Sequence, residues 1–437
     1  MTTIRLNELI DSQPLGRYQK IIISLCMALM ILDGYDIQAM AYAAPLIMES
    51  WQVDKALLGV VFSAALGGLF VGSLLLSSLS DRYGRRPILL VSTFAFAVLM
   101  LLTPLAKNLE QLAMIRFVTG IFLGGIMPNA MAYSSDIVPK RQQVFIMTMI
   151  SAGFTLGAIL GGFVATALKP FGWEAIFYFG GIMPLILFVF MYFWIPESQK
   201  FLVARSRHPK KVLESLRKFY PSLGLNDDVK IELEDKTTHK TSPLDLFKQG
   251  RAFFTSTMWI ITVLNMISLY FLSSWLPALG KESGLSINQA LMLGTVLQLG
   301  ALIGSLSQGA IIHKFGFYKV LMPVFVLAIV TVGYIGYSVH SVALLFVVVF
   351  LAGFAVIGGQ PTLNALSASH YPVLLRSTGV GWSIGIGRLG SVIGPVLGGS
   401  LAASMNIGPL FLIAAIPSVL VLVMLFVQAR GNTGSAV

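Results

Sequence analysis

Residues 57–106 read LLGVVFSAALGGLFVGSLLLSSLSDRYGRRPILLVSTFAFAVLMLLTPLA. Two apolar runs, at 57–79 and 88–106, stand on either side of a short segment that holds four charged residues. A helix needs about 20 apolar residues to cross the hydrocarbon core of a bilayer, which is roughly 30 Å thick. Both runs have about this length, and neither contains a charged residue. The stretch therefore predicts two membrane-spanning helices joined by a charged loop.

The rest of the chain repeats this pattern. Of its 437 residues, 56% are hydrophobic and 11% are Asp, Glu, Lys or Arg, whereas soluble domains carry about 25% charged residues. Reading every apolar run in the same way predicts an all-α integral membrane protein and excludes a soluble enzyme. The twelve expected spans are 20–44, 57–79, 88–106, 111–135, 143–168, 173–194, 252–278, 287–311, 319–338, 342–367, 377–403 and 407–428.

Lysine and arginine predict how the spans are oriented. If the N-terminus is cytoplasmic, the inner segments hold 24 of the 30 Lys and Arg residues and the outer loops hold four. Because cytoplasmic loops carry an excess of positive charge, we expect both termini to be cytoplasmic. The net charge of +11 then reflects this topology and contact with anionic lipid headgroups, so we expect no nucleic-acid partner.

A charged central segment separates two halves with similar patterns. Twenty charged residues lie between Glu197 and Arg251. Blocks of glycine and proline before this segment recur after it, in the same order, at offsets of 233 and 237 residues. The matched blocks are Gly120, Gly125, Pro128 and Pro139 with Gly353, Gly358, Pro361 and Pro372, and Gly153-x3-Gly157-x3-Gly161-Gly162 with Gly390-x3-Gly394-x3-Gly398-Gly399. Such repeats are typical of secondary transporters with a substrate site between the halves. We expect an N-terminal six-helix bundle at 1–195, a cytoplasmic loop at 196–251 and a C-terminal six-helix bundle at 252–437.

The charged loop of the opening stretch also carries a family resemblance. Leu79-Ser80-Asp81-Arg82-Tyr83-Gly84-Arg85-Arg86-Pro87 resembles the loop motif that joins spans 2 and 3 in the major facilitator superfamily. Arg116-x3-Gly120-x3-Gly124 resembles a second motif of that superfamily. The resemblance covers essentially the whole chain and implies the superfamily's two pseudo-symmetric six-helix bundles. The second copy of the loop motif departs from the pattern, because His313-Lys314-Phe315-Gly316 has His where an acidic residue is expected.

The first expected span narrows the resemblance. Asp33-Gly34-Tyr35-Asp36 places two carboxylates within a membrane helix, where each charge costs roughly 2.5–3.5 kcal/mol on insertion scales. The segment resembles the signature of the aromatic acid:proton symporter family, which imports benzoate-type acids. The resemblance implies a symporter that imports a hydroxybenzoate-like carboxylate with protons across the bacterial inner membrane, by alternating access. It also implies functional charged residues at Arg116, Asp136, Arg376 and Arg388.

The charged residues within spans allow two readings. Asp33 and Asp36 lie one turn apart on one helix face. Either at least one of them takes up and releases the coupling proton, or both form permanent ion pairs with Arg116 and Arg388. The planar guanidinium of arginine suits a carboxylate. We expect one of the arginines to bind the substrate carboxylate and the other to pair with an aspartate, and we favour Arg388 for the substrate.

Uncharged polar and aromatic residues within the spans complete the expected substrate site. Spans 1, 4, 7 and 10 line the cavity in the resembled fold, although polar residues in membrane helices also simply hydrogen-bond neighbouring helices. The candidates for the pocket are Tyr42, Asn265, Gln360 and Asn364. Trp259, Tyr270, Trp275 and Trp382 could stack on an aromatic ring. Trp275, near an outer end, is expected in the interfacial aromatic belt.

Charged residues at the inner ends of the spans predict a cytoplasmic gate. Asp81 could pair with Arg141 or cap the span that starts near Arg376, and either contact would hold the outward-open state closed on the inside. Asp136 could join this network or be a solvated helix end. The expected gate residues are Asp81, Arg82, Arg85, Asp136, Arg141 and Arg376.

Other functions stay open on the sequence alone. Pro196-Glu197-Ser198 resembles a motif of sugar and polyol porters, against which the altered second loop motif and the intramembrane aspartates argue. A porter of another organic anion with the same fold, and a membrane receptor or scaffold, also stay open. A multidrug exporter is disfavoured because Ala158 stands where the exporter motif has proline. The sequence shows no nucleotide-binding Gly-Lys-Ser/Thr loop and no evident metal-ligand or nucleophile–base pattern. We expect no cofactor, no metal and no enzymatic activity. The expected partners are the aromatic acid, protons and the lipid bilayer, with the monomer as the functional unit.

Overall fold

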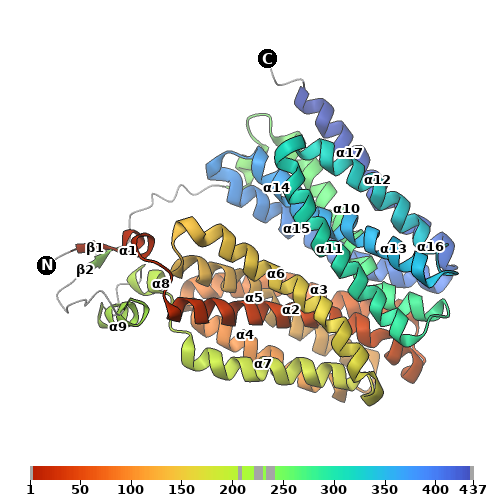
Figure 1. Ribbon diagram of the computed structural model, residues 1–437, viewed down its shortest axis with the longest axis horizontal. Coiled ribbons are helices and arrows are strands. Elements are labelled where there is room, and N and C mark those ends of the chain that lie inside the picture. Colours follow the sequence, from red (N-terminus) through yellow and green to blue (C-terminus); the bar gives the residue numbers. More distant parts are fainter. Residues whose placement is uncertain (1–2, 205–208, 221–229, 233–241, 434–437) are drawn as a thin grey trace.

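The computed structural model describes residues 3–204, 209–220, 230–232 and 242–433, and its ribbon is dominated by long helices (Figure 1). Within these residues, twelve helical segments are long and apolar enough to cross a membrane, which confirms the predicted all-α membrane fold. In the first half they are α2 (Arg17–Trp51), α3 (Lys55–Tyr83), α4 (Arg85–Leu102), α5 (Leu109–Ile137), α6 (Lys140–Leu168) and α7 (Glu174–Trp194). In the second half they are α10 (Ala252–Glu282), α11 (Ile287–Phe315), α12 (Phe317–Ile335), α13 (Val342–Ala352) continued by η5 (Gly353–Ile357) and α14 (Gly358–His370), α15 (Val373–Ser404), and α16 (Ile407–Ala414) with α17 (Ile416–Thr433).

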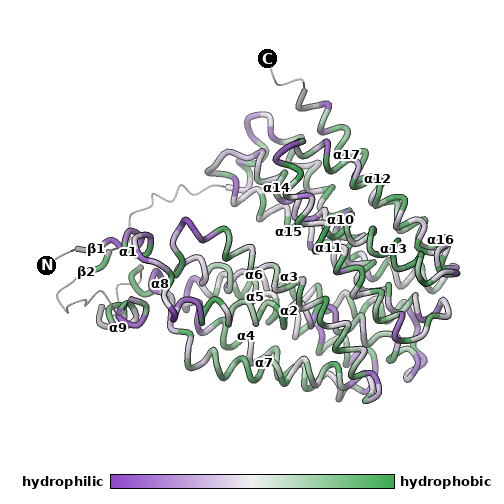
Figure 2. Tube along the Cα trace, viewed as in Figure 1, coloured by the Kyte–Doolittle hydropathy of each residue, from purple (hydrophilic) through white to green (hydrophobic). Residues whose placement is uncertain are grey.

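These helices form two bundles that meet at one end and diverge at the other (Figure 1). Helices α2–α7 make one bundle and α10–α17 make the other, while the short helices α1 (Leu6–Ser12), α8 (Gln199–Ala204) and α9 (Pro209–Phe219) extend from the diverging end. Hydrophobic residues follow the bundle helices, and hydrophilic residues gather at helix ends and in the short helices (Figure 2). The division into domains at residues 195 and 251 stays a prediction.

Short polar caps set where the spans begin. The carboxylate of Asp54 accepts a hydrogen bond from the Ala56 amide at the start of α3, and Asn108 accepts one from the Gln111 amide at the start of α5. Such caps satisfy amides that have no partner within the helix. Gly84, with φ +106°, allows the sharp turn between α3 and α4.

Glycines of the sequence repeat bring neighbouring helices into backbone contact. A Cβ atom on Gly120 of α5 would lie 2.0 Å from the Ala65 carbonyl oxygen of α3. A Cβ atom on Gly353, its counterpart in the second half, would lie 2.0 Å from the Leu297 carbonyl oxygen of α11. Small residues permit this close packing in membrane helices. The offset of 233 residues therefore corresponds to the same helix contact made twice.

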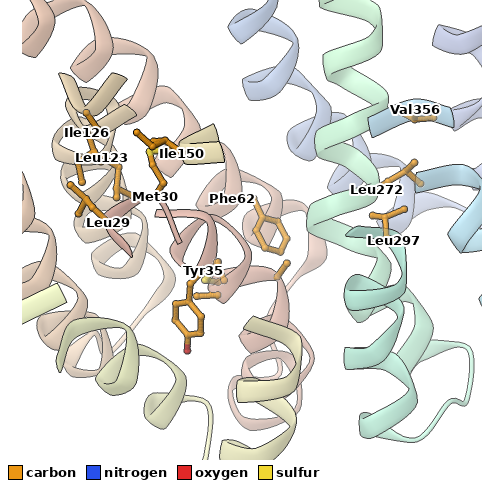
Figure 3. Close-up of a cluster of buried hydrophobic side chains, with 14 of the residues drawn as sticks. Leu29, Met30, Tyr35, Phe62, Leu123, Ile126, Ile150, Leu272, Leu297 and Val356 are labelled. Carbon is orange, nitrogen blue, oxygen red and sulfur yellow. The ribbon is translucent and has the colours of Figure 1, made fainter. Parts of the chain in front are cut away.

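Apolar side chains fill the interior of each bundle. In Figure 3, Leu29 and Met30 of α2 lie near Leu123 and Ile126 of α5. In the other bundle, Leu272, Leu297 and Val356 extend from α10, α11 and η5. All seven side chains are buried, with at most 1% of their surface exposed. These side chains belong to one buried apolar cluster that includes residues of both halves.

The halves touch at the end expected to face outwards. Ser63 of α3 donates to the Val392 carbonyl of α15 at 2.6 Å. Phe62 packs edge-on against Trp275, with ring centroids 5.3 Å apart. The expectation that Trp275 belongs to the interfacial belt is wrong, because its side chain is fully buried and its indole nitrogen donates to the Pro395 carbonyl.

Polar side chains also connect the two halves at this end. Lys55 of α3 forms an ion pair with Glu282 at the end of α10, and it also donates to the Ala402 carbonyl of α15. Lys169, just after α6, donates to the side chain of Asn288 on α11 at 2.8 Å. With both contacts in place, the ribbons of the two halves diverge towards the end that carries α1 and α9 (Figure 1).

Segments outside the spans pack onto the first bundle. Strand β1 (Thr3–Arg5) pairs in parallel with β2 (Lys230–Glu232) of the central segment, which the sequence did not predict. Gln19 of α2 donates to the Ile137 carbonyl and to the hydroxyl of Tyr220, which follows α9. The central segment holds two short helices, α8 and α9, whereas 205–208, 221–229 and 233–241 lie outside the described residues.

We predict that Lys55→Gln shifts the protein away from the conformation that is closed at this end. The pair is partly exposed, so its loss should change the conformational ratio by no more than about fivefold, the equivalent of about 1 kcal/mol. Spin labels at positions 144 and 377, in a Cys26→Ala background, would report a shorter separation at the opposite end. Arg5→Gln removes an exposed ion pair with Glu8 on the N-terminal segment and serves as control. Identical distance distributions for Lys55→Gln and the control would contradict the assignment.

Candidate functional site

A cavity of about 310 Å³ lies between the two bundles, at the lower end of the roughly 300–1,000 Å³ typical of small-molecule sites. Helices α2, α3, α5 and α6 line it from the first half, and α10, α11, α14 and α15 line it from the second. Its charged lining residues are Asp33 of α2 and Arg388 of α15. One acid and one base, from opposite halves, therefore face a single space.

The second aspartate of the α2 signature forms a buried ion pair. Asp36 receives two hydrogen bonds from Arg116 of α5, at 2.6 Å and 2.8 Å, and neither side chain is more than 1% exposed. The guanidinium also lies over the ring of Phe177, 5.8 Å from its centroid. A bidentate pair of this kind satisfies both charges in a medium that excludes water. The ion-pair reading therefore holds for Asp36 and Arg116.

This geometry removes Arg116 from the candidates for substrate binding. Its guanidinium is held by Asp36 and does not line the central cavity. Arg388 differs, because its guanidinium forms no hydrogen bond or ion pair with another residue in the described part of the chain. Of these two arginines, Arg388 is therefore the one that can bind an anion in the cavity.

Asp33 also differs from Asp36. It lines the cavity, is 3% exposed, and its Oδ1 atom has no hydrogen-bond partner among the described residues. A buried ionised carboxylate without a partner is costly, whereas a bound proton or a nearby cation removes that cost. The two aspartates, equivalent in the sequence pattern, therefore have separate environments.

Some of the polar residues expected in the pocket lie at the cavity and others do not, and their role in substrate binding stays a prediction. Gln360 and Asn364 of α14 line the cavity, and Asn265 of α10 hydrogen-bonds Gln360 from behind it. Tyr42 does not reach the cavity, since it is fully buried between helices and donates to the Ala158 carbonyl of α6. The placement of Tyr42 in the pocket is wrong.

Trp382 is also misplaced by the sequence interpretation. It is 44% exposed, stacks on Trp259 with ring centroids 6.0 Å apart, and does not line the cavity. On α15 it lies six residues before Arg388, which is more than one and a half helical turns and puts it on another face. Two aromatic residues do line the cavity, Phe154 of α6 and Tyr270 of α10. Tyr270 was among the aromatic candidates of the sequence, whereas Phe154 was not, and its position within the glycine run of α6 was the one available signal.

Apolar side chains form most of the remaining lining. They come from both halves, so a flat apolar group would be enclosed on both sides while its polar groups met Asp33, Arg388 and the α14 amides. The apolar lining residues are Ile37, Leu69, Leu123, Met127, Phe154, Met266, Leu269, Ile357 and Ile384.

Two of the expected gate residues meet inside the first bundle. Arg85 at the start of α4 forms an ion pair with Asp136 near the end of α5 and donates to the Ala132 carbonyl. Asp136 also accepts a hydrogen bond from Ser198 at 2.5 Å and lies 3.7 Å from the Lys200 ammonium. With 5% of its surface exposed, Asp136 is part of a network, so the alternative of a solvated helix end is wrong.

Glu197 completes this network, which the sequence interpretation did not anticipate. One of its oxygens accepts hydrogen bonds from the backbone amides of Arg85, Arg86 and Ser198. Burial raises the pKa of the carboxyl, and the three amides oppose that rise. The remaining gate candidates lie exposed at the same end, and their gating role stays a prediction: Asp81 and Arg82 end α3, Arg141 begins α6 and Arg376 begins α15.

Residues 26–222 and 258–435 match the family model of the Major Facilitator Superfamily. The chain belongs to this superfamily. It is therefore a multi-pass membrane transporter and not an enzyme.

Relatives within the major facilitator superfamily resemble the chain over nearly its whole length. The 4-hydroxybenzoate transporter PcaK of Pseudomonas aeruginosa is 36% identical over 394 residues, which are 90% of this chain and 88% of PcaK. The gallate transporter of Pseudomonas putida is 32% identical, over 95% of this chain and 93% of its own length. The benzoate transport protein of Acinetobacter baylyi is 31% identical, over 97% and 92%.

Solved structures of the superfamily share the fold. A bacterial homolog of the human lysosomal transporter Spinster, in an inward-facing and occupied conformation, aligns with a TM-score of 0.76 at 14% identity, covering 95% of this chain and 98% of that one. A D-xylose-proton symporter aligns with a TM-score of 0.71 at 17% identity, covering 92% and 96%. At these identities the likeness concerns the fold alone.

We predict that Asp36→Asn strongly destabilises the protein, because it leaves the Arg116 charge buried without its partner. The expected decrease in the free energy of unfolding is about 3–5 kcal/mol. It would be detected as a lower melting temperature in detergent. The double variant Asp36→Asn/Arg116→Gln should recover part of it. Asp11→Asn removes a more exposed pair with Lys140 and is the control. A melting temperature for Asp36→Asn equal to that of Asp11→Asn would refute a stabilising role for the pair.

A second prediction concerns the turn between α3 and α4. Gly84→Ala should lower the melting temperature, since φ is +106° there and an added Cβ would lie 2.2 Å from a Glu197 oxygen. Gly381→Ala is the matched control, because a Cβ at Gly381 in α15 meets nothing within 4 Å. Equal melting temperatures for the two variants would show that the Glu197 contact is dispensable.

Proposed function

We propose that the protein imports a small aromatic carboxylate of the hydroxybenzoate class together with one or more protons, by alternating access across the bacterial inner membrane. The observation that carries this proposal is that Arg388 and Asp33 line one cavity, and that neither side chain forms an ion pair or hydrogen bond with another side chain among the described residues. The names of the relatives, which concern 4-hydroxybenzoate, gallate and benzoate, support the substrate class.

Arg388 is the proposed carboxylate ligand. Its guanidinium is unpaired within the described residues and lines a cavity whose other walls are mostly apolar. A carboxylate can accept two parallel hydrogen bonds from a guanidinium, and this contact is strong where water is excluded. The apolar walls around Phe154 would enclose the ring. Arg388 therefore selects an anion, and the cavity walls select a flat apolar body.

Asp33 is the proposed proton carrier. Arg116 already compensates the charge of Asp36, so a proton on Asp36 would break a buried bidentate pair. Asp33 has no such partner among the described residues, and it lines the cavity through which the substrate passes. Protonation of Asp33 therefore breaks fewer existing contacts than protonation of Asp36 would.

Orientation and assembly complete the proposal. We take both termini to be cytoplasmic, from the charge asymmetry of the loops, so the present conformation is open to the cytoplasm. A single chain supplies both walls of the cavity, so the monomer is the proposed functional unit. A membrane potential of about 100 mV provides roughly 2.3 kcal/mol per net charge moved, and it drives accumulation only if more protons than substrate charges enter.

A sugar porter is the alternative of the same fold. The D-xylose-proton symporter supports it through overall structure alone. A neutral sugar would offer no anionic group to Arg388, and the largely apolar cavity would leave many of its hydroxyl groups without hydrogen-bond partners, which is costly. An exporter of hydrophobic cations is also disfavoured, because its substrate would place a second positive charge next to Arg388.

The test is uptake of labelled 4-hydroxybenzoate into proteoliposomes under an inward proton gradient, with benzoate, glucose and a lipophilic cation as competitors. We predict gradient-dependent uptake that aromatic acids alone inhibit. Arg388→Gln should abolish uptake and exchange, because the anion loses its ligand. Asp33→Asn should lose gradient-driven accumulation and keep exchange of internal for external substrate, because exchange moves no net proton.

Ser307→Ala is the control, since its hydroxyl bonds carbonyls of its own helix and lies outside the cavity lining. Inhibition by glucose alone, or no carboxylate flux in folded protein, would overturn the substrate class. If the Asp33→Asn variant still accumulates substrate as the wild type does, Asp33 is not the proton carrier.

A further inference from the structure

Three side-chain amides form a hydrogen-bonded chain at one wall of the cavity. Asn265 of α10 donates to the Gln360 side-chain oxygen at 2.7 Å, and Gln360 donates to the Asn364 side-chain oxygen at 3.0 Å. Asn265 is 1% exposed and lies behind the wall, whereas Gln360 and Asn364 line the cavity. We call these three residues the amide chain.

A backbone carbonyl fixes the direction of the amide chain. The amide nitrogen of Asn265 also donates to the Val356 carbonyl, at 3.2 Å. A carbonyl only accepts hydrogen bonds, so the Asn265 nitrogen must point towards it and towards Gln360. Each later amide then takes the same orientation. The nitrogen of Asn364 therefore lies at the cavity end of the chain, where it donates to no described residue.

The π-helical segment η5 explains why that carbonyl is available. Val356 lies in this segment, whose wider turns change the backbone hydrogen-bond pattern. A second carbonyl of the segment, that of Phe354, is likewise bonded by a side-chain amide, from Gln308 of α11 at 2.9 Å. The irregular turn is thus held by neighbouring helices on two sides, and it anchors the amide chain to the backbone.

The cavity end of the amide chain matches a hydroxyl group. The Asn364 nitrogen can donate, and the Asn364 oxygen retains a second lone pair that can accept. A hydroxyl group both donates and accepts, whereas a carboxylate only accepts and is better matched by Arg388. The lining also holds other polar side chains, such as Gln38, Tyr270 and Gln298. Among its polar groups, Arg388 suits a carboxylate and the oriented Asn364 amide suits a hydroxyl group.

We propose that the amide chain recognises a ring hydroxyl of the substrate, so that the cargo is a hydroxylated benzoate rather than benzoate itself. This inference rests on the proposed function. When such a ligand binds, its carboxylate meets Arg388 and its hydroxyl exchanges hydrogen bonds with Asn364. An acid without the hydroxyl leaves the Asn364 amide buried against an apolar ring without a partner, which weakens binding.

The experiment is calorimetric titration of the purified full-length protein with benzoate, 3-hydroxybenzoate, 4-hydroxybenzoate and 4-methoxybenzoate. Of the two hydroxybenzoates, the one that the wild type prefers should bind about tenfold more tightly than benzoate, because it satisfies one further hydrogen bond. The methoxy acid keeps an acceptor oxygen and lacks the donor, so it should bind no better than benzoate.

Asn364→Leu should bring hydroxybenzoate and benzoate within about twofold of each other while the Kd of benzoate changes less than about threefold. Asn406→Leu is the matched control, because Asn406 is exposed before α16 and its side chain makes no cap hydrogen bond. It should keep the wild-type preference. Arg388→Gln should weaken all four acids alike.

Equal binding of benzoate and both hydroxybenzoates by the wild type would overturn this inference and leave the proposed function standing. So would an unchanged preference in Asn364→Leu. Binding of none of the acids by folded wild-type protein would overturn the proposed function and this inference with it. If Asn364→Leu does not fold, the wild-type comparison of hydroxy with methoxy acid decides, since tight binding of the methoxy acid excludes a required donor.

Discussion

The buried ion pair between Asp36 and Arg116 is the constraint on which the rest of the site depends. Asp33, Asp36, Arg116 and Arg388 are ionisable side chains near the middle of this membrane protein. In the ion pair, Asp36 and Arg116 compensate each other's charge, so neither is available to a proton or a substrate. The remaining two, Asp33 and Arg388, line the cavity from opposite halves. Because the paired charges keep α2 and α5 together, Asp33 is held at a fixed place on the cavity wall.

The same rule, that polar groups away from water need partners, organises the regions around the cavity. At the diverging end, Glu197 and Asp136 gather amides, a guanidinium and a hydroxyl within the first bundle. At the closed end, Lys55 reaches across to the second bundle. Contacts of the first kind keep a bundle rigid, whereas contacts of the second kind must break when the halves move. Their partial exposure makes them weak enough to do so.

Much of the fold could be predicted from the sequence, because a bilayer imposes the length and apolarity of each span. Helix ends were predicted less well: α2 continues through Pro45 to Trp51, beyond the expected end at residue 44. Residue type and depth, together with the family resemblance, pointed to Asp33, Arg388, Gln360 and Asn364, which line the cavity. These signals could not show which way a side chain points around its helix, and this is why Tyr42 and Trp382 were misplaced. The π-helical turn at Val356 depends on contacts with α10 and α11, which no local pattern encodes.

The proposed roles of Asp33 and Arg388 imply a coupling rule that follows from charge alone. In the empty carrier, the carboxylate and the guanidinium compensate each other across the cavity. With a carboxylate on Arg388 and a proton on Asp33, the cavity again holds no net charge. Only a half-loaded carrier would enclose an uncompensated charge, and that cost rises as water is excluded. Movement of the halves is then favoured for the empty and the fully loaded states. One proton per monovalent acid makes the cycle electroneutral, so a pH gradient drives it and the membrane potential does not.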